Sequence, residues 1–329
     1  MSPNVSADMA SPSRSIFFVI RLMLLVCCSC SAFVAAAEAP QDALGWLTAM
    51  RDARKNLDFT GKAALLRDSQ VQIVAVEHAV VNGTERECMH SLDQPGHEIV
   101  RQAGSATYFL PEAQRSVAGG KPLRVDGLGT LPEDLASYQR FYRFNLGARE
   151  QLIGRSVQEV LIEPLDEYRY GRRYWIDVDS KLPLKYQALN GERVLEQLVF
   201  SELSLNKAAV GTFPEHKAAP YVQEALPLES LQWRLERVPP GYRLVSYMRH
   251  SAPGKKPVEH LLLSDGLSAL SLYIEESDGA AGLKKQVRHF GAMHFYSRAM
   301  NGYQITVMGE APLAAVGLVG DGVERAEQR

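Results

Sequence analysis

The spacing of apolar residues along the chain changes from a helical repeat to a strand-like repeat soon after residue 57. Before that point, apolar side chains recur at positions that share one face of a helix: Ala43, Trp46, Leu47, Met50 and Leu57. Asp42 stands directly before them, and its carboxylate suits the N-cap position of a helix. The pattern therefore predicts an amphipathic helix over residues 42–57.

Runs with a period of two follow this helix. The strand-like runs of the first domain are Gln70–His78, Glu98–Gln102, Ala106–Leu110, Ser156–Glu163, Tyr174–Val178, Leu184–Ala188 and Val194–Phe200. Asn190-Gly191 separates the last two runs, and this dipeptide favours a tight hairpin turn. These features predict a sheet that is mostly antiparallel.

One interruption of the strand pattern is helical. Pro132 stands at a position typical of the first turn, and Leu135, Tyr138 and Tyr142 follow at helical spacing. The first domain is therefore predicted to be of the α+β class, with a long, curved antiparallel sheet, one helix at its start and a helical insert. We place this domain at residues 40–205.

A connector and a second periodic segment follow. Residues 206–227 are polar and contain Pro214, Pro220 and Pro227, which indicates an extended linker. The strand-like runs beyond it are Trp233–Arg237, Tyr242–His250, Val258–Ser264, Ala269–Glu275, Lys285–Phe290, Ala292–Arg298 and Tyr303–Gly309. A closing helix is expected over Pro312–Ala326, so residues 228–326 are predicted to form a smaller α+β domain with an antiparallel sheet.

The first 37 residues have the order of a secretory signal. Arg14 and Arg21 precede the apolar run Leu22–Val34, and three alanines ending at Ala37 follow it. The run is short against the roughly 20 residues of a membrane span. We expect cleavage after Ala37 and export of the mature chain, with an uncleaved anchor or lipidation at Cys30 as the alternatives.

Charge and cysteine content narrow the class of protein. The chain has 329 residues, 36 Lys plus Arg, 38 Asp plus Glu and a net charge of -2, which argues against a nucleic-acid partner. Three of its 4 cysteines lie in the predicted signal, so the mature chain keeps Cys88 alone. It then has no internal disulfide, and Cys88 is predicted to be a buried structural thiol.

A search for catalytic motifs predicts a protein that is not an enzyme. Gly266-Leu267-Ser268-Ala269-Leu270 begins like a nucleophile elbow but lacks its last glycine, and Gly127-Leu128-Gly129 has no βαβ unit around it. His289 and His294 are five residues apart, so they fall on opposite faces of a continuous strand, and no spacing indicates a metal site. No cofactor is expected.

Aromatic and basic residues are concentrated in the first domain. The aromatic residues that we consider for an apolar cavity are Phe59, Tyr108, Phe109, Tyr138, Phe141, Tyr142, Trp175 and Tyr186. Such residues usually form an ordinary core, but a strongly bent sheet that one helix only partly covers can leave a concavity that binds an apolar ligand. The arginines around them, Arg169, Arg172 and Arg173 included, form either a solvated face or a site for an acidic peptide or lipid head.

Several segments resemble one known family, and the resemblance covers nearly the whole mature chain. The segments are Asp166-Glu167-Tyr168-Arg169-Tyr170-Gly171-Arg172-Arg173-Tyr174-Trp175-Ile176-Asp177, Leu182-Pro183-Leu184-Lys185, Val194–Phe200, His260–Leu267, Tyr296-Ser297-Arg298 and Tyr303–Glu310. In this order, and after a signal peptide, they resemble the RseB/MucB family.

The resemblance implies a periplasmic regulator of envelope stress. Members of this family bind the periplasmic part of a membrane anti-sigma factor of RseA or MucA type, shield it from regulated proteolysis and release it on binding lipid or lipopolysaccharide. Their first domain is similar to the half-open barrel of LolA and LolB. We therefore expect the first domain to sense lipid and the second to bind the anti-sigma factor. The alternative is a periplasmic lipid or lipoprotein carrier of LolA/LolB type, which would lack the second domain.

The same resemblance and the basic stretch described above suggest which residues of this chain bind the partner. The candidates are Arg169, Arg172, Arg173, Tyr296, Arg298 and Tyr303. The sequence leaves open which lipid is bound, and whether the chain also forms a homo-oligomer.

Overall fold

The computed structural model describes residues 40–93, 98–102, 105–110, 115–119, 131–205, 222–277 and 285–326. For residues 98–102, 105–110, 115–119 and 222–223, only the backbone is described. The predicted signal over residues 1–37 and most of the predicted linker lie outside the described residues. Residues 40–329 belong to one compact unit. We call residues 40–205 the first half and residues 222–326 the second half.

The N-terminal helix forms as its pattern predicts. Helix α2 spans Ala43–Asn56, and the Asp42 carboxylate accepts a hydrogen bond of 2.7 Å from the Gly45 backbone N–H. Trp46, Leu47 and Met50 are buried, at 1%, 0% and 0% exposure. Burying a large apolar side chain contributes roughly 1.5–3 kcal/mol, so this face accounts for the attachment of the helix to the sheet.

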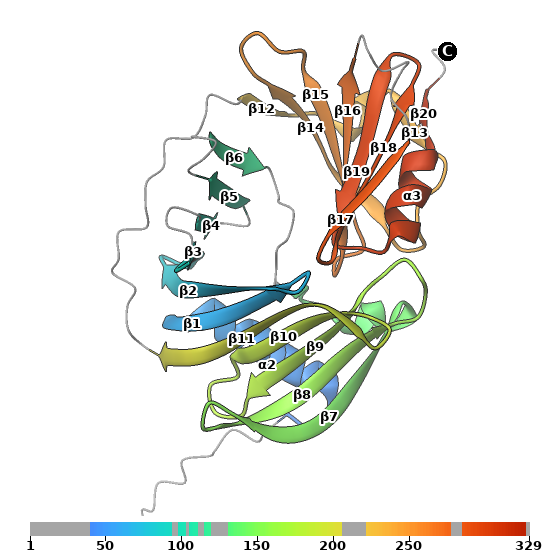
Figure 1. Ribbon diagram of the computed structural model, residues 1–329. Helices are drawn as coiled ribbons and strands as arrows, with labels where there is room; N and C mark the ends of the chain where they lie inside the picture. Colours follow the sequence, from blue (N-terminus) through green and yellow to red (C-terminus); the bar gives the residue numbers. More distant parts are fainter. Residues whose placement is uncertain are drawn as a thin grey trace, which may run out of the picture. The chain divides into compact units, whose positions relative to one another are not determined.

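The first half contains one antiparallel sheet of 11 strands, in the order β6-β5-β4-β3-β2-β1-β11-β10-β9-β8-β7 (Figure 1). The strands are β1 Phe59–Arg67, β2 Gln70–Val81, β3 Thr84–Ser91, β4 Glu98–Gln102, β5 Ser105–Leu110, β6 Arg115–Gly119, β7 Tyr142–Leu152, β8 Arg155–Pro164, β9 Gly171–Asp177, β10 Pro183–Asn190 and β11 Arg193–Leu205. Since β6 and β7 end this order, the sheet as described is open. The predicted α+β class and half-open antiparallel sheet are confirmed.

Two local expectations in the first half need adjustment. The hairpin between β10 and β11 forms, but Asn190 pairs with Arg193, so the turn is Gly191-Glu192. Gly191 has φ +60°, a value that glycine adopts without a steric penalty. The predicted helical insert is only a short 3₁₀ helix, η2, at Ala136–Arg140. Tyr142, which we assigned to the insert, opens strand β7 instead.

One face of the large sheet carries an apolar core beneath α2. Its buried members are Phe59, Ala63, Leu65, Val74, Val76, Met89, Leu182, Leu198 and Phe200, with Ala53 and Leu57 of the helix segment packed against them. Cys88 on β3 is buried at 3% exposure, so the prediction of a buried thiol is confirmed. We call this side, which α2 covers, the inner face, and the other side the outer face.

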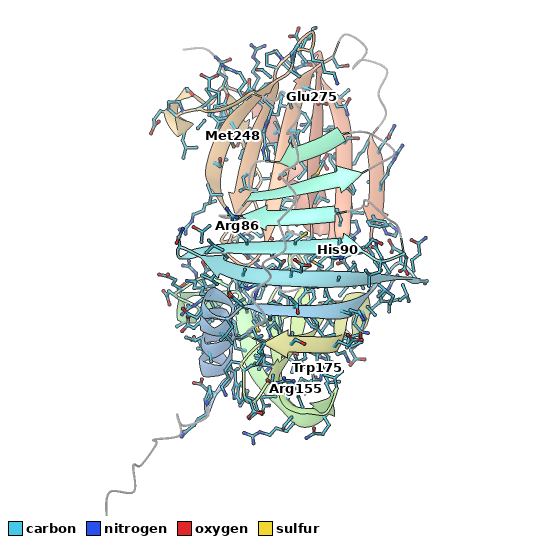
Figure 2. The ribbon with its side chains drawn as sticks, turned by 90° about the vertical axis from the view of Figure 1, so that its left-hand side faces the viewer. Arg86, His90, Arg155, Trp175, Met248 and Glu275 are labelled. Atoms are coloured by element: carbon cyan, nitrogen blue, oxygen red, sulfur yellow. The ribbon has the colours of Figure 1, made fainter. Side chains whose placement is uncertain are left out.

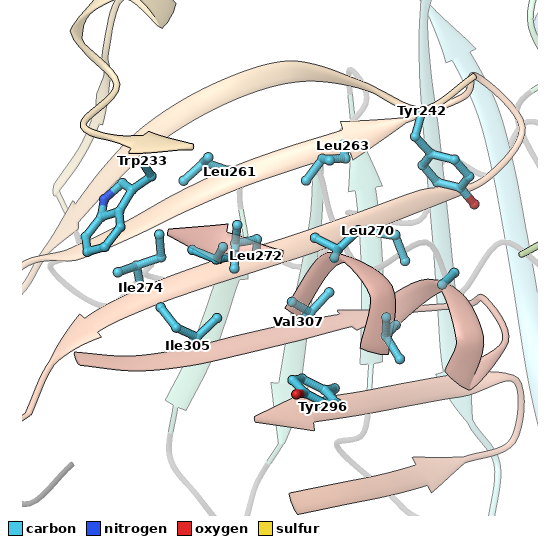
Figure 3. Packing of buried hydrophobic residues seen from close by; sticks show 14 of the residues in the cluster. Trp233, Tyr242, Leu261, Leu263, Leu270, Leu272, Ile274, Tyr296, Ile305 and Val307 are labelled. Carbon is cyan, nitrogen blue, oxygen red and sulfur yellow. The ribbon is translucent and has the colours of Figure 1, made fainter. Parts of the chain in front are cut away.

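The second half contains a sheet of 7 strands in the order β12-β14-β15-β16-β19-β18-β17 and a two-stranded sheet of β13 and β20. The elements are β12 Val222–Ala225, η3 Leu228–Ser230, β13 Trp233–Leu235, β14 Arg243–Ser251, β15 Val258–Ser264, β16 Ala269–Glu276, β17 Gln286–Phe290, β18 Met293–Met300, β19 Tyr303–Gly309, α3 Leu313–Asp321 and β20 Val323–Arg325. Leu261, Leu272, Val307 and Tyr296 lie in its core (Figure 3).

In the second half, the predicted last residues of the closing helix and of the linker were wrong. The closing helix does not run to Ala326, because α3 ends at Asp321 and β20 pairs with β13. Residues 222–225, which we assigned to the linker, form β12 and pair with β14. Within the described residues, no helix is long and apolar enough to cross a membrane.

Candidate functional site

The loop between β8 and β9 contacts the second half through one buried arginine. Arg169 Nε donates a hydrogen bond of 2.6 Å to Asp265 Oδ2, and neither side chain is exposed to solvent. Arg169 Nη1 donates to the carboxylate of Asp166, and Nη2 donates to the backbone carbonyl of Pro240. The guanidinium therefore joins its own loop to two loops of the second half.

The Asp265 carboxylate is the acceptor on which this contact converges. Besides Arg169, Tyr142 Oη donates to Oδ2 at 2.8 Å. The backbone N–H groups of Leu267 and Ser268 donate to Oδ1 at 2.9 and 2.6 Å. Because a buried carboxylate is costly unless donors surround it, these four hydrogen bonds account for an aspartate at this depth.

Aromatic rings enclose the same guanidinium. Its Cζ lies 4.6 Å from the ring centroid of Phe141, 5.6 Å from that of Tyr142 and 5.0 Å from that of Tyr242. Gly241, at φ +83°, lies so close to Phe141 that a Cβ there would overlap the ring. We call Arg169, Asp265, Tyr142, Tyr242 and Phe141 the junction cluster.

Burial and charge shift the pKa values inside the junction cluster. Burial, and after it the charge of Asp265, raises the pKa of Tyr142 well above its ordinary value, so the hydroxyl remains a donor. Burial by itself lowers the pKa of Arg169, but the hydrogen bond that Arg169 donates to Asp265, and the charge of that carboxylate, outweigh burial and raise this pKa. Arg169 therefore stays a cation, and Tyr142 a neutral donor, across the physiological pH range.

A second buried arginine lies beside this cluster. Arg172 Nη2 donates to the backbone carbonyl of Leu267, two residues beyond Asp265. The residues around a small pocket at this point come from both halves: Tyr170, Arg172, Tyr186, Ala188, Ser268, Ala292 and Glu310. Arg169 and Arg172 therefore approach the same loop of the second half from one end of β9.

The turn between β17 and β18 makes a separate contact with the first half. The backbone N–H of Gly291 donates to Asp68 Oδ2 at 2.5 Å, and that of Ala292 donates to Glu196 Oε1 at 3.1 Å. Arg67 pairs with Glu196 at 2.9 Å, and its guanidinium lies 5.0 Å from the Phe290 ring centroid. Like the junction cluster, this contact is made by charged and polar groups.

The strand register separates two of the residues that we predicted for a lipid cavity. Tyr186 pairs with Tyr174, and these rings lie 5.2 Å apart on one face of the sheet. Trp175 pairs with Lys185, so it lies on the opposite face, where the ammonium is 3.8 Å from its ring centroid. Trp175 and Tyr186 therefore cannot line one cavity on one face. Figure 2 labels Trp175 on β9 and Arg155 on β8.

The other cavity candidates are divided among three environments. Phe59 belongs to the inner-face core and stacks on His78 at 4.8 Å. Phe141 and Tyr142 belong to the junction cluster, and the ring of Tyr138 lies against Gly266 of the second half. Tyr108 and Phe109 lie on β5, whose side chains are outside the described residues.

The predicted partner residues are mostly engaged within the chain. Arg169 and Arg172 are buried at the junction, and Tyr296 is 1% exposed, with its hydroxyl donating to Asp321. Arg298 donates to the backbone carbonyls of Gly320 and Val323, both at 2.7 Å. These contacts give them internal roles, and their contact with a partner stays a prediction.

Two further predicted partner residues are half-buried, as Arg298 is. Arg173 forms an ion pair of 3.3 Å with Glu159 on the outer face. Tyr303 packs edge-on against Trp233, with ring centroids 5.0 Å apart. Both therefore keep part of their surface in water, as a direct contact with a partner requires.

The two histidines that the sequence separated lie next to each other. The turn at Gly291 makes His289 and His294 a cross-strand pair, with ring centroids 5.8 Å apart. Nδ1 of His294 lies 3.1 Å from Tyr170 Oη and 3.0 Å from the Ala311 carbonyl oxygen. Among the described residues, no group of three or more His, Cys, Asp or Glu side chains could hold a metal ion.

Sequence reasoning did not select the second-half members of the junction. Tyr242 was placed at the start of the predicted strand Tyr242–His250, and Asp265 was named only within the segment His260–Leu267 that resembles the family. The one available signal is Asp265-Gly266 directly after the apolar run of β15, a pattern that ordinary surface turns share.

Comparison with known proteins identifies the family. The MucB/RseB N-terminal domain matches residues 42–225, and the MucB/RseB C-terminal domain matches residues 227–324. The chain belongs to the MucB/RseB family. Within it, the chain is 29% identical over 295 residues to the sigma factor AlgU regulatory protein MucB of Pseudomonas aeruginosa, over 86% of this chain and 91% of that protein.

Other members extend the likeness. The sigma-E factor regulatory protein RseB of Salmonella typhimurium is 25% identical over 304 residues, over 89% of this chain and 93% of that protein. Among solved structures, the Pseudomonas aeruginosa MucA/MucB complex matches with a TM-score of 0.70 and 26% identity, over 87% of this chain and 99% of that one. The resemblance read from the sequence is therefore confirmed.

Proposed function

We propose that this MucB/RseB protein binds the periplasmic segment of a membrane anti-sigma factor and shields that segment from regulated proteolysis. The observation that carries the proposal is the match to a MucB chain solved with MucA, because it extends over 87% of this chain and thus includes both halves. A second solved complex, of MucB with the periplasmic part of MucA, matches at 25% identity and a TM-score of 0.65.

The proposal is one of binding and not of catalysis. The family consists of regulatory proteins by name, and the Arg169 guanidinium, the Asp265 carboxylate and the Tyr142 hydroxyl of the junction cluster are hydrogen-bonded to one another. A buried arginine and a saturated carboxylate suit the joining of two halves, whereas general acid or base catalysis requires access to a substrate. The site of action that we infer is the periplasm, after export by the N-terminal signal.

We place the anti-sigma factor on the second half and at its junction with the first. Tyr303, Arg173 and Arg298 keep part of their surface in solvent. Since Arg298 already donates to the carbonyls of Gly320 and Val323, Tyr303 and Arg173 are the first to substitute. The exposed edge strand β17 contributes further surface, since all five of its residues are exposed. Tyr296 and Arg298 would support such a surface from behind by holding β18 against α3.

Release by lipid is the finer part of the proposal. The inner face of the first half carries Phe59 and Tyr186 on its described strands, and a bent, open sheet is the kind of structure that encloses an acyl chain. Ligand binding weakens the partner complex only if the ligand prefers the partner-free state. Trp175 lies on the outer face and serves as the matched aromatic control: its substitution should leave the release by lipid unchanged.

Fluorescence anisotropy of a dye-labelled periplasmic segment of the organism's own anti-sigma factor tests this function. Residues 38–329 should raise the anisotropy, and lipopolysaccharide fragments should then lower it again. Tyr186→Asp should reduce the response to lipid, while Trp175→Gln should retain it. Lipid binding without any binding of the segment would favour a lipid or lipoprotein carrier.

A further inference from the structure

Resting on the function proposed above, we propose that the Arg169–Asp265 ion pair is a reversible latch that holds the two halves in the arrangement that binds the partner. Opening the latch separates the β8–β9 loop from the loop after β15, and the affinity for the anti-sigma segment falls. The two residues thus position the binding surface without having to touch the partner.

Several hydrogen bonds between the halves converge on these two side chains. Separating them breaks three hydrogen bonds at once: Arg169 to Asp265, Arg169 to Pro240 and Tyr142 to Asp265. The remaining donors to Asp265 are the backbone N–H groups of its own loop, and the remaining acceptor for Arg169 is Asp166 of its own loop. Each charge therefore keeps a local partner when the halves separate, and the opened state is not left with a bare buried ion.

The same chemistry makes the latch reversible. Both side chains have 0% exposure in the closed arrangement, so closing removes two charges from water, which offsets much of their attraction. In the open arrangement the charges regain hydration. The closed and open states of such a pair consequently differ by far less than the strength of the individual contacts, and a ligand with a moderate preference can shift the balance.

Strand β9 connects the latch with the inner face of the first half. Arg172 follows Arg169 by three residues and donates to Leu267 in the loop that holds Asp265. Two residues further, Tyr174 packs against Tyr186 on the inner face. A ligand that displaces β9 from its place in the sheet would draw both arginines away from the same loop. Because arginine donates through a planar fork with fixed directions, small displacements suffice to break its bonds.

The contact at the turn between β17 and β18 provides the hinge that the latch requires. The turn at Gly291 and Ala292 is held by carboxylates that accept from backbone N–H groups, and Arg67 neutralises one of these carboxylates. A substitution at Asp265 leaves this contact intact. The halves should therefore move about it as a hinge when the latch opens.

The test compares Asp265→Asn with a matched control. Asparagine can still accept from the loop N–H groups but carries no charge for Arg169. Glu87→Gln likewise removes one carboxylate from a buried ion pair, Arg54–Glu87 at 2.9 Å, which lies wholly within the first half. Small-angle X-ray scattering of residues 38–329 measures the separation of the halves, and calorimetry with the synthetic anti-sigma segment measures the affinity.

We expect Asp265→Asn to increase the radius of gyration and to weaken binding of the segment at least tenfold, while Glu87→Gln changes neither. Tyr142→Phe, which removes one hydrogen bond to Asp265, should weaken binding about two- to tenfold and keeps the test decisive if Asp265→Asn does not fold. Unchanged scattering and affinity in Asp265→Asn, or an equal loss in Glu87→Gln, would overturn the latch. Failure of the wild-type chain to bind the segment would instead refute the proposed function, and the scattering comparison would still decide whether the latch exists.

Discussion

Acid should destabilise the second half through a buried pair of histidines in its sheet. His260 on β15 is 3% exposed, and its Nδ1 lies 3.2 Å from Nε2 of His250 on β14. Its Nε2 lies 3.0 Å from Ser271 Oγ on β16, and the ring of Tyr273 stacks on it at 4.3 Å. Both ring nitrogens of His260 thus face neutral groups.

The pKa shift gives the sign of the effect. Burial, and after it the neighbouring His250, lowers the pKa of His260 from 6.5 to about 4, and burial also lowers that of His250. In the unfolded chain the imidazole has a pKa of about 6.5, so between pH 6.5 and 4 the unfolded state binds more protons than the folded state. Stability is therefore complete above pH 6.5 and is lost as the pH falls towards 4.

The magnitude follows from the same values. A lowering from 6.5 to about 4 corresponds to about 3 kcal/mol, at roughly 1.4 kcal/mol per pH unit. Most of this loss, about 2.5 kcal/mol, should have occurred by pH 4.5. Because the two imidazoles interact directly, they should titrate as a pair.

Urea unfolding of the mature chain at pH 7 and pH 4.5 measures the effect. Trp46 and Trp175 are replaced by Phe, so that Trp233 of the second half alone reports among the 3 tryptophans of the chain. His260→Gln in this background retains a hydrogen-bonding side chain but does not titrate. We expect the free energy of unfolding to fall about 2.5 kcal/mol more in the parent than in the variant. An equal fall in both would refute this reasoning.

Three further substitutions probe the packing and the charges. Gly320→Ala should lower the free energy of unfolding by about 1–3 kcal/mol, because its Cβ would overlap the Tyr296 ring beneath α3; an unchanged melting temperature would contradict this close packing. Asp42→Ala removes the N-cap of α2 and should cost about 1 kcal/mol in urea unfolding, a loss that Asp42→Asn should largely avoid. Glu87→Ala should cost about 3–5 kcal/mol because it takes both the carboxylate and any hydrogen-bond acceptor at this position away from the buried Arg54 guanidinium, whereas the exposed Glu202→Ala should cost less than about 1 kcal/mol. Similar losses for the two glutamates would show that burial does not decide the strength of these pairs.

Burial of one face helped to place strands from the sequence but did not decide it alone. The exposed β17 was predicted as Lys285–Phe290, whereas β1, whose Phe59, Ala63 and Leu65 are buried, was missed. The predicted strands Val258–Ser264 and Tyr303–Gly309 have the correct first and last residues, because their apolar residues contact a continuous core. Strand β7 was missed since most of its residues are partly or fully exposed and its composition is mixed. The end of α3 was misplaced because the apolar Val323 continues the helical pattern although it belongs to β20.

The junction could not be predicted because its members are far apart in the sequence. Arg169 and Asp265 are separated by 96 positions, and each looks like an ordinary surface residue in its own loop. Periodicity reports contacts within an element or between neighbouring strands, whereas this ion pair depends on how two sheets meet. The arginine-rich stretch was selected by its composition, but its buried members prove to hold the chain together.

The central claim is that this chain binds a membrane anti-sigma factor. Calorimetric titration of purified residues 38–329 with the periplasmic segment of the organism's own anti-sigma factor tests it most directly. The account predicts saturable binding with one site per chain, and weaker binding once the protein is saturated with lipopolysaccharide fragments. No heat of binding to the segment, from a folded chain that still binds the lipid, would contradict it.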